Sequence, residues 1–462
     1  MVFFFTFVRI IMHFMVFGIK KIRSFALLAV IVGLISCGSR KPAYVRPVTQ
    51  AMPDAVVALT TIAPQQPQAT PEVQVEQPVE TVVESVSWLG QMQRSLDSMC
   101  HSPLFQTSQL GLYIYDLTTG EPVYTLNANQ RMRPASCQKL VTGISALHYL
   151  GGDYQFTTRL FITGSVAGRI LKGDVYVAGG MDPLLSPSDL AAFAAALKGK
   201  GIDQVAGRIY ADLSMKDDLP YGWGWCWDDK FGPLSALMVN GRDEFAEHWI
   251  KALRNAGIRL SHAAVAPRIL PPGAQQLATA SHSIDEVLQP MMKKSNNIYA
   301  ECLFYQIAAM GGQKQAGRKQ VAEHVQKLLE SIGQGSASCQ VADGSGLSMY
   351  NYLTPQLLVA LLNYAYQTPS VYNHLTASLP IAGVDGTLEK RMKDSPAQGN
   401  VRAKTGTVEA ISSLSGYLKA VNGHDLSFCI LNQGLVTTSQ GRDFQDKVCI
   451  LLCGGPQQII QQ

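Results

Sequence analysis

The sequence predicts an α+β fold in which an antiparallel sheet is flanked by helices. Residues 111–116 and 121–126 are rich in β-forming side chains and are separated by a Thr-Thr-Gly turn, which is typical of a hairpin. Residues 413–418 and 426–431 form a second such pair, joined through an Asn-Gly dipeptide. Segments with apolar side chains at helical spacing lie between the two hairpins, so helices are available to cover the sheet.

Two of these helical segments begin at recognisable signals. The first follows Pro134, a residue that suits the first turn of a helix. Its apolar side chains recur at helical spacing, at Leu140, Val141, Ile144, Leu147 and Leu150. The second begins at residues 294–297 and stops at a Gly-Gly pair. Its apolar positions are Ile298, Leu303, Phe304, Ile307 and Ala308.

The composition is that of a globular protein with little excess charge. Of the 462 residues, 47% are hydrophobic and 16% are charged, against roughly 25% charged in an average soluble protein. The formal net charge is +4, and it equals the contribution of Arg9, Lys20, Lys21 and Arg23, because no acidic residue precedes residue 37. The rest of the chain is neutral, so nucleic acid is not expected as a partner.

The N-terminus carries a targeting signal. Residues 25–36 form a short apolar run behind a basic segment, whereas a bilayer-spanning helix needs about 20 residues. Residues 34–38 (Leu-Ile-Ser-Cys-Gly) resemble a bacterial lipoprotein box. The resemblance implies that residues 1–36 are a signal peptide and that a lipidated Cys37 anchors a periplasm-facing protein to the inner or outer membrane. A plain signal peptide and a membrane anchor are the alternatives.

Residues 37–87 are predicted to be a tether. Seven prolines are interleaved with Gln, Thr, Val and Glu, and no apolar period persists, so the segment cannot bury enough surface to fold. Residues 456–462 are predicted to be a short tail.

The nine cysteines show no CxxC pair and no spacing with histidine that suits a metal, so we expect no metal, no other cofactor and no disulfide.

A candidate nucleophile lies at the start of the first predicted helix. Ser136 and Lys139 (S-x-x-K) are one helical turn apart and therefore face the same side. A serine hydroxyl needs a base within hydrogen-bond reach, and a lysine becomes such a base when burial and neighbouring cations lower its pKa. Because S-x-x-K recurs by chance on many surface helices, this pattern alone does not decide the function.

Two further motifs supply partners for this pair. Ser295 and Asn297 (S-x-N) open the second predicted helix, with a hydroxyl that can relay a proton and an amide that can hold a carbonyl. Residues 404–407 (Lys-Thr-Gly-Thr) lie on a strand before the second hairpin, where lysine and threonine can bind a carboxylate and Gly406 permits close backbone approach. This order of motifs is typical of penicillin-binding proteins and class A β-lactamases.

Over most of residues 100–450 the sequence resembles the class C low-molecular-mass penicillin-binding proteins, which are D-alanyl-D-alanine carboxypeptidases and endopeptidases. The segments that carry the resemblance are 133–139, 151–156, 173–183, 207–212, 343–348 and 383–388. The resemblance implies a serine β-lactamase/transpeptidase-like fold made by residues 88–151 and 286–455. It also implies an inserted domain rich in β-structure at residues 152–285, which lies between the first two motifs.

The same resemblance implies a role for each site residue. Ser136 would attack the carbonyl between two terminal D-alanines of a peptidoglycan peptide, and Lys139 would take its proton. Ser295 would pass a proton toward the leaving amine, Asn297 would orient the acyl chain, and Lys404 would set a positive field. The substrate-binding strand residues would be Thr405, Gly406 and Thr407. The oxyanion hole would consist of the backbone N–H groups of Ser136 and Thr407, and β-lactam antibiotics would be inhibitors.

Four side chains near these motifs allow more than one interpretation. Asp182 is expected to be a turn residue, with substrate contact as the alternative. Met349 stands where the family commonly has a basic residue, so recognition of the third stem-peptide residue stays undefined. Cys137 is expected to pack in the interior. Glu301 is expected to be a structural or helix-surface charge and not a general base.

The favoured function is a D,D-carboxypeptidase or endopeptidase, and two alternatives stay open. A serine β-lactamase would need a base that speeds deacylation, and no motif supplies one. A catalytically weak peptidoglycan-binding lipoprotein would have no need for Lys139 beside Ser136.

Overall fold

The computed structural model describes residues 87–229, 231–335 and 339–456. The predicted signal peptide, Cys37, nearly all of the tether and nearly all of the tail lie outside these ranges. Within them, no helix is both long and apolar enough to cross a bilayer.

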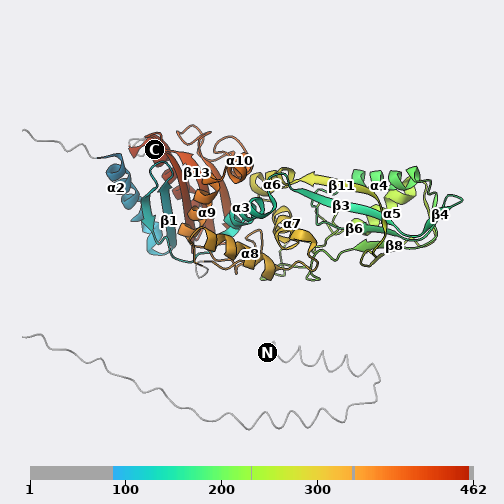
Figure 1. Ribbon diagram of the computed structural model, residues 1–462. Coiled ribbons are helices and arrows are strands. Elements are labelled where there is room, and N and C mark those ends of the chain that lie inside the picture. Colours follow the sequence, from blue (N-terminus) through green and yellow to red (C-terminus); the bar gives the residue numbers. More distant parts are fainter. Residues whose placement is uncertain (1–86, 230, 336–338, 457–462) are drawn as a thin grey trace, which may run out of the picture. The chain divides into compact units, whose positions relative to one another are not determined.

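A five-stranded antiparallel sheet carries the K-T-G motif (Figure 1). Its strand order is β12-β13-β14-β1-β2, so the N-terminal hairpin pairs with the C-terminal one. Both predicted hairpins are therefore confirmed, and β14 joins them. The strands are β1 (Gln109–Asp116), β2 (Glu121–Leu126), β12 (Arg402–Val408), β13 (Ile411–Lys419) and β14 (Asp425–Gln433).

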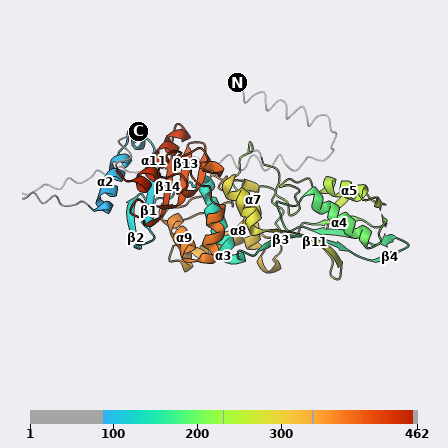
Figure 2. The ribbon, with the colours of Figure 1, turned by 90° about the horizontal axis from the view of Figure 1, so that it is seen from above.

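Helices bury both faces of this sheet, because successive strand side chains point to opposite faces and both sets are apolar. Phe428 and Ile430 of β14 belong to one core cluster, whereas Cys429, between them, belongs to another. Figure 2 shows the sheet between α11 and α9. The helices are α2 (Trp88–Cys100) and α11 (Thr438–Gly454) on one face, with α3 (Gln138–Leu150), α9 (Pro355–Gln367) and α10 (Pro369–Ser378) on the other.

A group of helices packs with α3 and positions the S-x-N motif. These helices are α6 (Ile284–Lys293), α7 (Asn297–Ala308) and α8 (Arg318–Ser331). Helix α7 begins at Asn297 because Ser295 has a φ of 56°, which lies outside the helical region, and the Asn296 side chain accepts a hydrogen bond from the Tyr299 N–H. The S-x-N residues therefore sit at the junction between α6 and α7.

Residues 155–283 form two further sheets between α3 and α6 (Figure 1). One has the order β10-β8-β6-β3-β11, and α4 and α5 pack on one of its faces; the other has the order β4-β5-β7-β9. The segment leaves α3 through β3 and returns to α6 through β11, and these two strands pair with each other. Its two ends therefore lie on neighbouring strands.

The elements of this segment are β3 (Gln155–Ile162), β4 (Ser165–Ala167), β5 (Ile170–Lys172), β6 (Val175–Ala178), α4 (Pro187–Gly199), β7 (Gln204–Val205), β8 (Ile209–Asp212), α5 (Phe245–Asn255), β9 (Arg259–Leu260), β10 (Val265–Pro267) and β11 (Gln275–Ser283).

Candidate active site

The turn that carries Ser136 is a short 3-10 helix, Ala135–Cys137, directly before α3. Ala135 has a φ of 46°, an uncommon value for a residue with a side chain, and tight packing surrounds it. A β-carbon on Gly346 would overlap the Ala135 carbonyl oxygen. Cys137 is buried, and its Sγ donates to the Lys404 carbonyl at 3.2 Å. The expectation that Cys137 packs in the interior is confirmed.

Lys139 lies in the first turn of α3, and its side chain is fully buried. Its Nζ donates to Oγ of Ser136 at 2.9 Å, to Oδ1 of Asn297 at 2.7 Å and to the Ser345 carbonyl at 2.8 Å. Burial, and then the charge of Lys404, hold the pKa of this amine well below its usual value. The amine can therefore lose its proton and act as a base toward Ser136.

Ser295 and Lys404 form the second pair of the site. Lys404 is fully buried on β12, and its Nζ donates to Oγ of Ser295 at 2.9 Å and to the Thr405 carbonyl at 2.6 Å. Burial lowers the pKa of Lys404 to about 8. A second hydroxyl thus lies beside a second buried lysine. This pair comes from the junction before α7 and from β12, whereas the first pair comes from the start of α3.

Asn297 lies at the start of α7, two residues after Ser295, and contacts Lys139 of the first pair. Because its side-chain oxygen accepts from Lys139, its amide nitrogen stays available to donate to another acceptor. An amide N–H at this position can hold a carbonyl of a bound peptide.

The main sheet is tied to the nucleophile turn. Oγ of Ser413, on the neighbouring strand, donates to the Pro134 carbonyl at 2.6 Å. Thr405 is half-buried and its hydroxyl donates to Thr387 at 2.7 Å, whereas Thr407 is exposed. The three motifs therefore meet at one place, with two hydroxyls, two buried lysines and an exposed threonine. This arrangement suits acyl transfer to a serine.

A loop outside the three motifs, residues 343–348, completes the surroundings of Lys139. Asp343 is buried, and its carboxylate accepts from the backbone N–H groups of Gly346 and Ser348, each at 2.7 Å, and from Nε1 of Trp225 at 2.9 Å. The loop thereby presents the Ser345 carbonyl to Lys139. Residues 343–348 were among the segments that carry the family resemblance. Their sequence pattern did not predict a contact with Lys139.

Among the described residues, neither Asp182 nor Met349 hydrogen-bonds to a residue of the three motifs. Asp182 is buried and accepts from Nδ1 of His282 at 2.6 Å and from the Leu184 N–H at 2.9 Å, which is the geometry of a turn. Among the described residues it makes no hydrogen bond to the Ser136 group. The backbone carbonyl of Met349 accepts from Nε of Arg133 at 3.0 Å.

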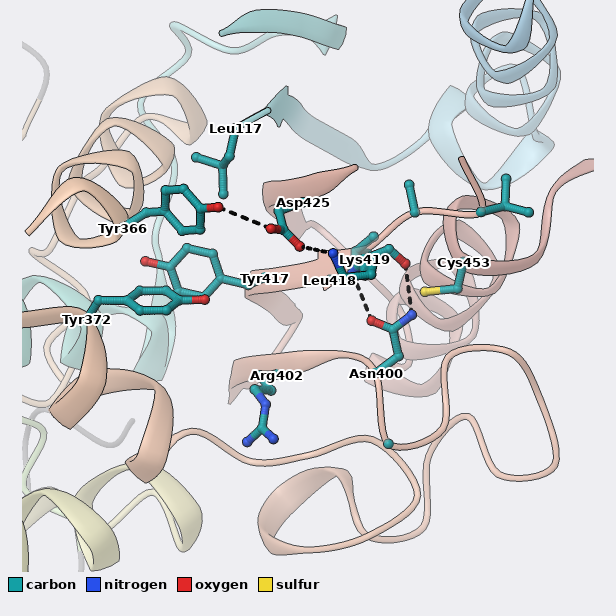
Figure 3. A pocket seen from close by; sticks show the side chains of 13 residues that line it. Leu117, Tyr366, Tyr372, Asn400, Arg402, Tyr417, Leu418, Lys419, Asp425 and Cys453 are labelled. Carbon is teal, nitrogen blue, oxygen red and sulfur yellow. Dashed lines mark hydrogen bonds and ion pairs between the residues drawn. The ribbon is translucent and has the colours of Figure 1, made fainter. Parts of the chain in front are cut away.

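A separate hollow of about 570 Å³ lies beside the beginning of β12 (Figure 3). Tyr366, Tyr372 and Tyr417 line it, and the Tyr366 hydroxyl donates to Asp425 at 3.1 Å. Arg402 also lines it. None of the motif residues lines this hollow, so it is not the space in which the three motifs meet.

Among the residues that the structure describes, no group of three or more His, Cys, Asp or Glu side chains is arranged to hold a metal ion.

An antiparallel sheet between helices, with S-x-x-K, S-x-N and K-T-G converging at one edge, defines a serine enzyme of the penicillin-binding class. The chain belongs to the D-Ala-D-Ala carboxypeptidase 3 (S13) family, whose model matches residues 92–243 and 232–452. It is therefore a serine-type D-Ala-D-Ala carboxypeptidase by family, and the resemblance seen in the sequence is confirmed.

Relatives from two bacteria agree with this assignment. The chain is 28% identical over 445 residues to a D-alanyl-D-alanine carboxypeptidase of Actinomadura sp. strain R39, covering 75% of this chain and 81% of the relative. It is 24% identical over 414 residues to the D-alanyl-D-alanine carboxypeptidase DacB of Haemophilus influenzae, covering 71% and 86%.

Solved structures agree on the fold. The crystal structure of penicillin binding protein 4 from H. influenzae matches with a TM-score of 0.70 at 23% identity, over 77% of this chain and 99% of that one. Its complex with a novel β-lactam matches with a TM-score of 0.66 at 24% identity, over the same shares of the two chains. The predicted fold class is confirmed.

Proposed function

We propose that this enzyme cleaves the peptide bond after D-alanine in peptidoglycan stem peptides, as a carboxypeptidase or endopeptidase, through an acyl-enzyme on Ser136. One observation carries the proposal: a fully buried amine, that of Lys139, lies 2.9 Å from the Ser136 hydroxyl. A buried lysine with a depressed pKa has little use in a binding protein, but it is the base that a serine nucleophile needs.

In the acylation step, Lys139 takes the proton of Ser136 while the oxygen attacks the carbonyl between the two D-alanines. The backbone N–H groups of Ser136 and Thr407 bind the oxygen as it becomes negative. Losing one donor of such a pair in other enzymes costs about 3–4 kcal/mol, so these donors are a major part of the proposed rate enhancement.

The second pair serves the leaving group. Ser295 passes a proton toward the departing amine, and the adjacent Lys404 keeps the surroundings positive. Thr405 and Thr407 bind the terminal carboxylate of the substrate, while Asn297 orients the acyl chain. Water then hydrolyses the ester and releases the shortened peptide.

β-Lactams are the proposed inhibitors, since they present a carbonyl and a nearby carboxylate to the same groups. The complex of the H. influenzae protein with a β-lactam supports this part of the proposal.

We also propose that Cys37 carries a lipid that holds the enzyme at a membrane, with residues 37–87 as the tether. A coil of this length spans about 40 Å, and a polyproline II conformation about 150 Å, so the catalytic domain would reach outward into the periplasm. The catalytic domain would consist of residues 88–151 and 286–455, with 152–285 as the insert. The separate sheets formed by residues 155–283 support this division.

Intact-protein mass spectrometry tests the proposal. The full-length protein is exposed briefly to benzylpenicillin, with Ser136→Ala as the matched control. A lasting single adduct on the wild type that is absent from the mutant supports the acyl-enzyme. Absence of an adduct with destruction of the drug would identify a β-lactamase, and absence of an adduct with intact drug would identify a binding protein.

A further inference from the structure

We propose that Glu301 is a positioning residue for the base, because it fixes the Gly344–Ser345 segment, whose Ser345 carbonyl binds the amine of Lys139. This inference rests on the proposed acyl-enzyme mechanism and deepens it. Neither Glu301 nor Ser345 belongs to the three motifs.

Glu301 holds the loop from one side. It lies on α7, one helical turn after Asn297, and is 1% exposed. Its Oε1 accepts from the Ser345 N–H at 2.9 Å and its Oε2 accepts from the Gly344 N–H at 3.1 Å. Since each carboxylate oxygen takes one of two successive N–H groups, the peptide between them has a single orientation.

The opposite side of the same segment faces α3. The Ser345 carbonyl accepts from Lys139 at 2.8 Å, and the Gly344 carbonyl accepts from the Thr142 hydroxyl at 2.7 Å. A β-carbon on Gly344 would lie 2.5 Å from that of Phe304 on α7, so a larger residue would push the segment away. Gly344 and Ser345 thus bridge the two helices. Their N–H groups bind Glu301 on α7, and their carbonyls accept from side chains on α3.

This bridge determines where the base points. A neutral lysine amine has two N–H bonds and one lone pair. The Ser345 carbonyl and Oδ1 of Asn297 accept the two N–H bonds, at 2.8 and 2.7 Å. The lone pair is then left to face the third neighbour, the Ser136 hydroxyl. Without a fixed Ser345 carbonyl the amine can rotate, and the lone pair loses its alignment with the proton that it must take.

The charged groups around Lys139 affect its pKa, so the contribution of Glu301 can be tested by measuring how the rate depends on pH. Lys404 on β12 disfavours the protonated amine, whereas Asp343, Glu301 and Cys137 favour it, and burial is the largest cause of the lowered pKa. Burial and the nearby Asp343 raise the pKa of Glu301 itself to about 8, and Lys139 opposes that rise. Glu301 is therefore largely protonated below about pH 8, and only its ionised form above that pH favours protonated Lys139.

The experiment measures the rate of acylation of the full-length protein by benzylpenicillin between about pH 5 and pH 9, for wild type and Glu301→Gln. The variant keeps the volume but loses the charge and one acceptor. We expect acylation to slow by about 10-fold to 100-fold, which is the scale of a lost hydrogen bond to a charged group. We also expect the loss to be larger above about pH 8, where wild-type Glu301 is ionised and accepts hydrogen bonds more strongly, than near pH 6.

Two further variants separate positioning from a structural role. Thr142→Val removes the buried hydrogen bond to the Gly344 carbonyl and leaves the Glu301 carboxyl in place, so its loss should be the same at pH 6 and pH 9. Glu301→Asp keeps an ionisable carboxyl on a shorter side chain, so its rate should fall although the carboxyl is retained. If Glu301→Gln does not fold, the rate of Glu301→Asp is compared with that of the wild type instead.

A folded Glu301→Gln protein with the wild-type rate over the whole pH range would overturn the inference. So would losses in Glu301→Gln and Thr142→Val that are equal at every pH. A wild-type protein that is never acylated would overturn the proposed function as well, and that result is distinct from the other two.

Discussion

A β-carbon built on Gly406 would lie 2.9 Å from the backbone nitrogen of Ser136, closer than such atoms approach in proteins. It would also lie 2.7 Å from the Pro134 carbonyl oxygen. The strand β12 thus approaches the nucleophile turn so closely that only hydrogen fits at position 406. This approach brings the backbone of Thr407 and that of Ser136 to the same site.

Gly406→Ala should therefore damage catalysis more than stability. The methyl group would push β12 from the turn and separate the two proposed oxyanion donors, so we expect acylation by benzylpenicillin to slow by about 100-fold or more. Gly199→Ala, where a β-carbon meets nothing within 4 Å, is the matched control. Unchanged acylation in a folded Gly406→Ala protein would show that this close approach is not needed.

Lys139→Ala should abolish acylation while the protein stays folded. General-base catalysis contributes about 10²-fold to 10⁴-fold, and among the described residues no other amine contacts the Ser136 hydroxyl. The measurement is adduct formation by intact mass, with near-ultraviolet circular dichroism as the check on folding. Normal acylation in a folded Lys139→Ala protein would remove Lys139 from the role of base.

Binding of the substrate carboxylate should weaken above about pH 8. Burial lowers the pKa of Lys404 to about 8, so the side chain is positive below that pH and loses its charge above it. We expect KM for a peptide ending in D-Ala-D-Ala to rise through this range. A peptide with an amidated C-terminus has no carboxylate and serves as the control. A KM that stays flat from neutral pH to well above pH 8 would contradict the role of Lys404.

Phe428→Ala should lower the free energy of unfolding by about 3–5 kcal/mol. Phe428 is fully buried between the main sheet and α11, and its removal leaves a cavity there. Val436→Ala is the control, because Val436 is 95% exposed and should change stability by less than about 0.5 kcal/mol. Chemical denaturation measures both, and equal midpoints for the two variants would refute this account of the core.

Cys37→Ser should release the protein from the membrane fraction of cells that produce it. The proposed lipid requires the thiol, and a serine hydroxyl cannot form the same thioether. Fractionation followed by detection of the protein measures the change. Retention of Cys37→Ser in the membrane, at the wild-type level, would favour the alternative of an uncleaved anchor.

The sequence by itself determined the local features of this protein. The hairpins, the helix that begins near Ser136 and the strand that carries Lys404 follow from apolar spacing and turn residues within short windows, and the structure has all of them. The three motifs and their order could be recognised for the same reason, since each lies within four consecutive residues.

Tertiary structure alone decided how these features act together. Lys139 contacts Asn297 and Ser345, which lie 158 and 206 residues away in the chain, and its burial depends on all the helices that pack around it. The burial of Glu301 against the loop after α8 has no signature in its own segment. Desolvation and charge proximity, which lower the pKa of the base, are properties of the assembled core, and no local pattern of residues encodes them.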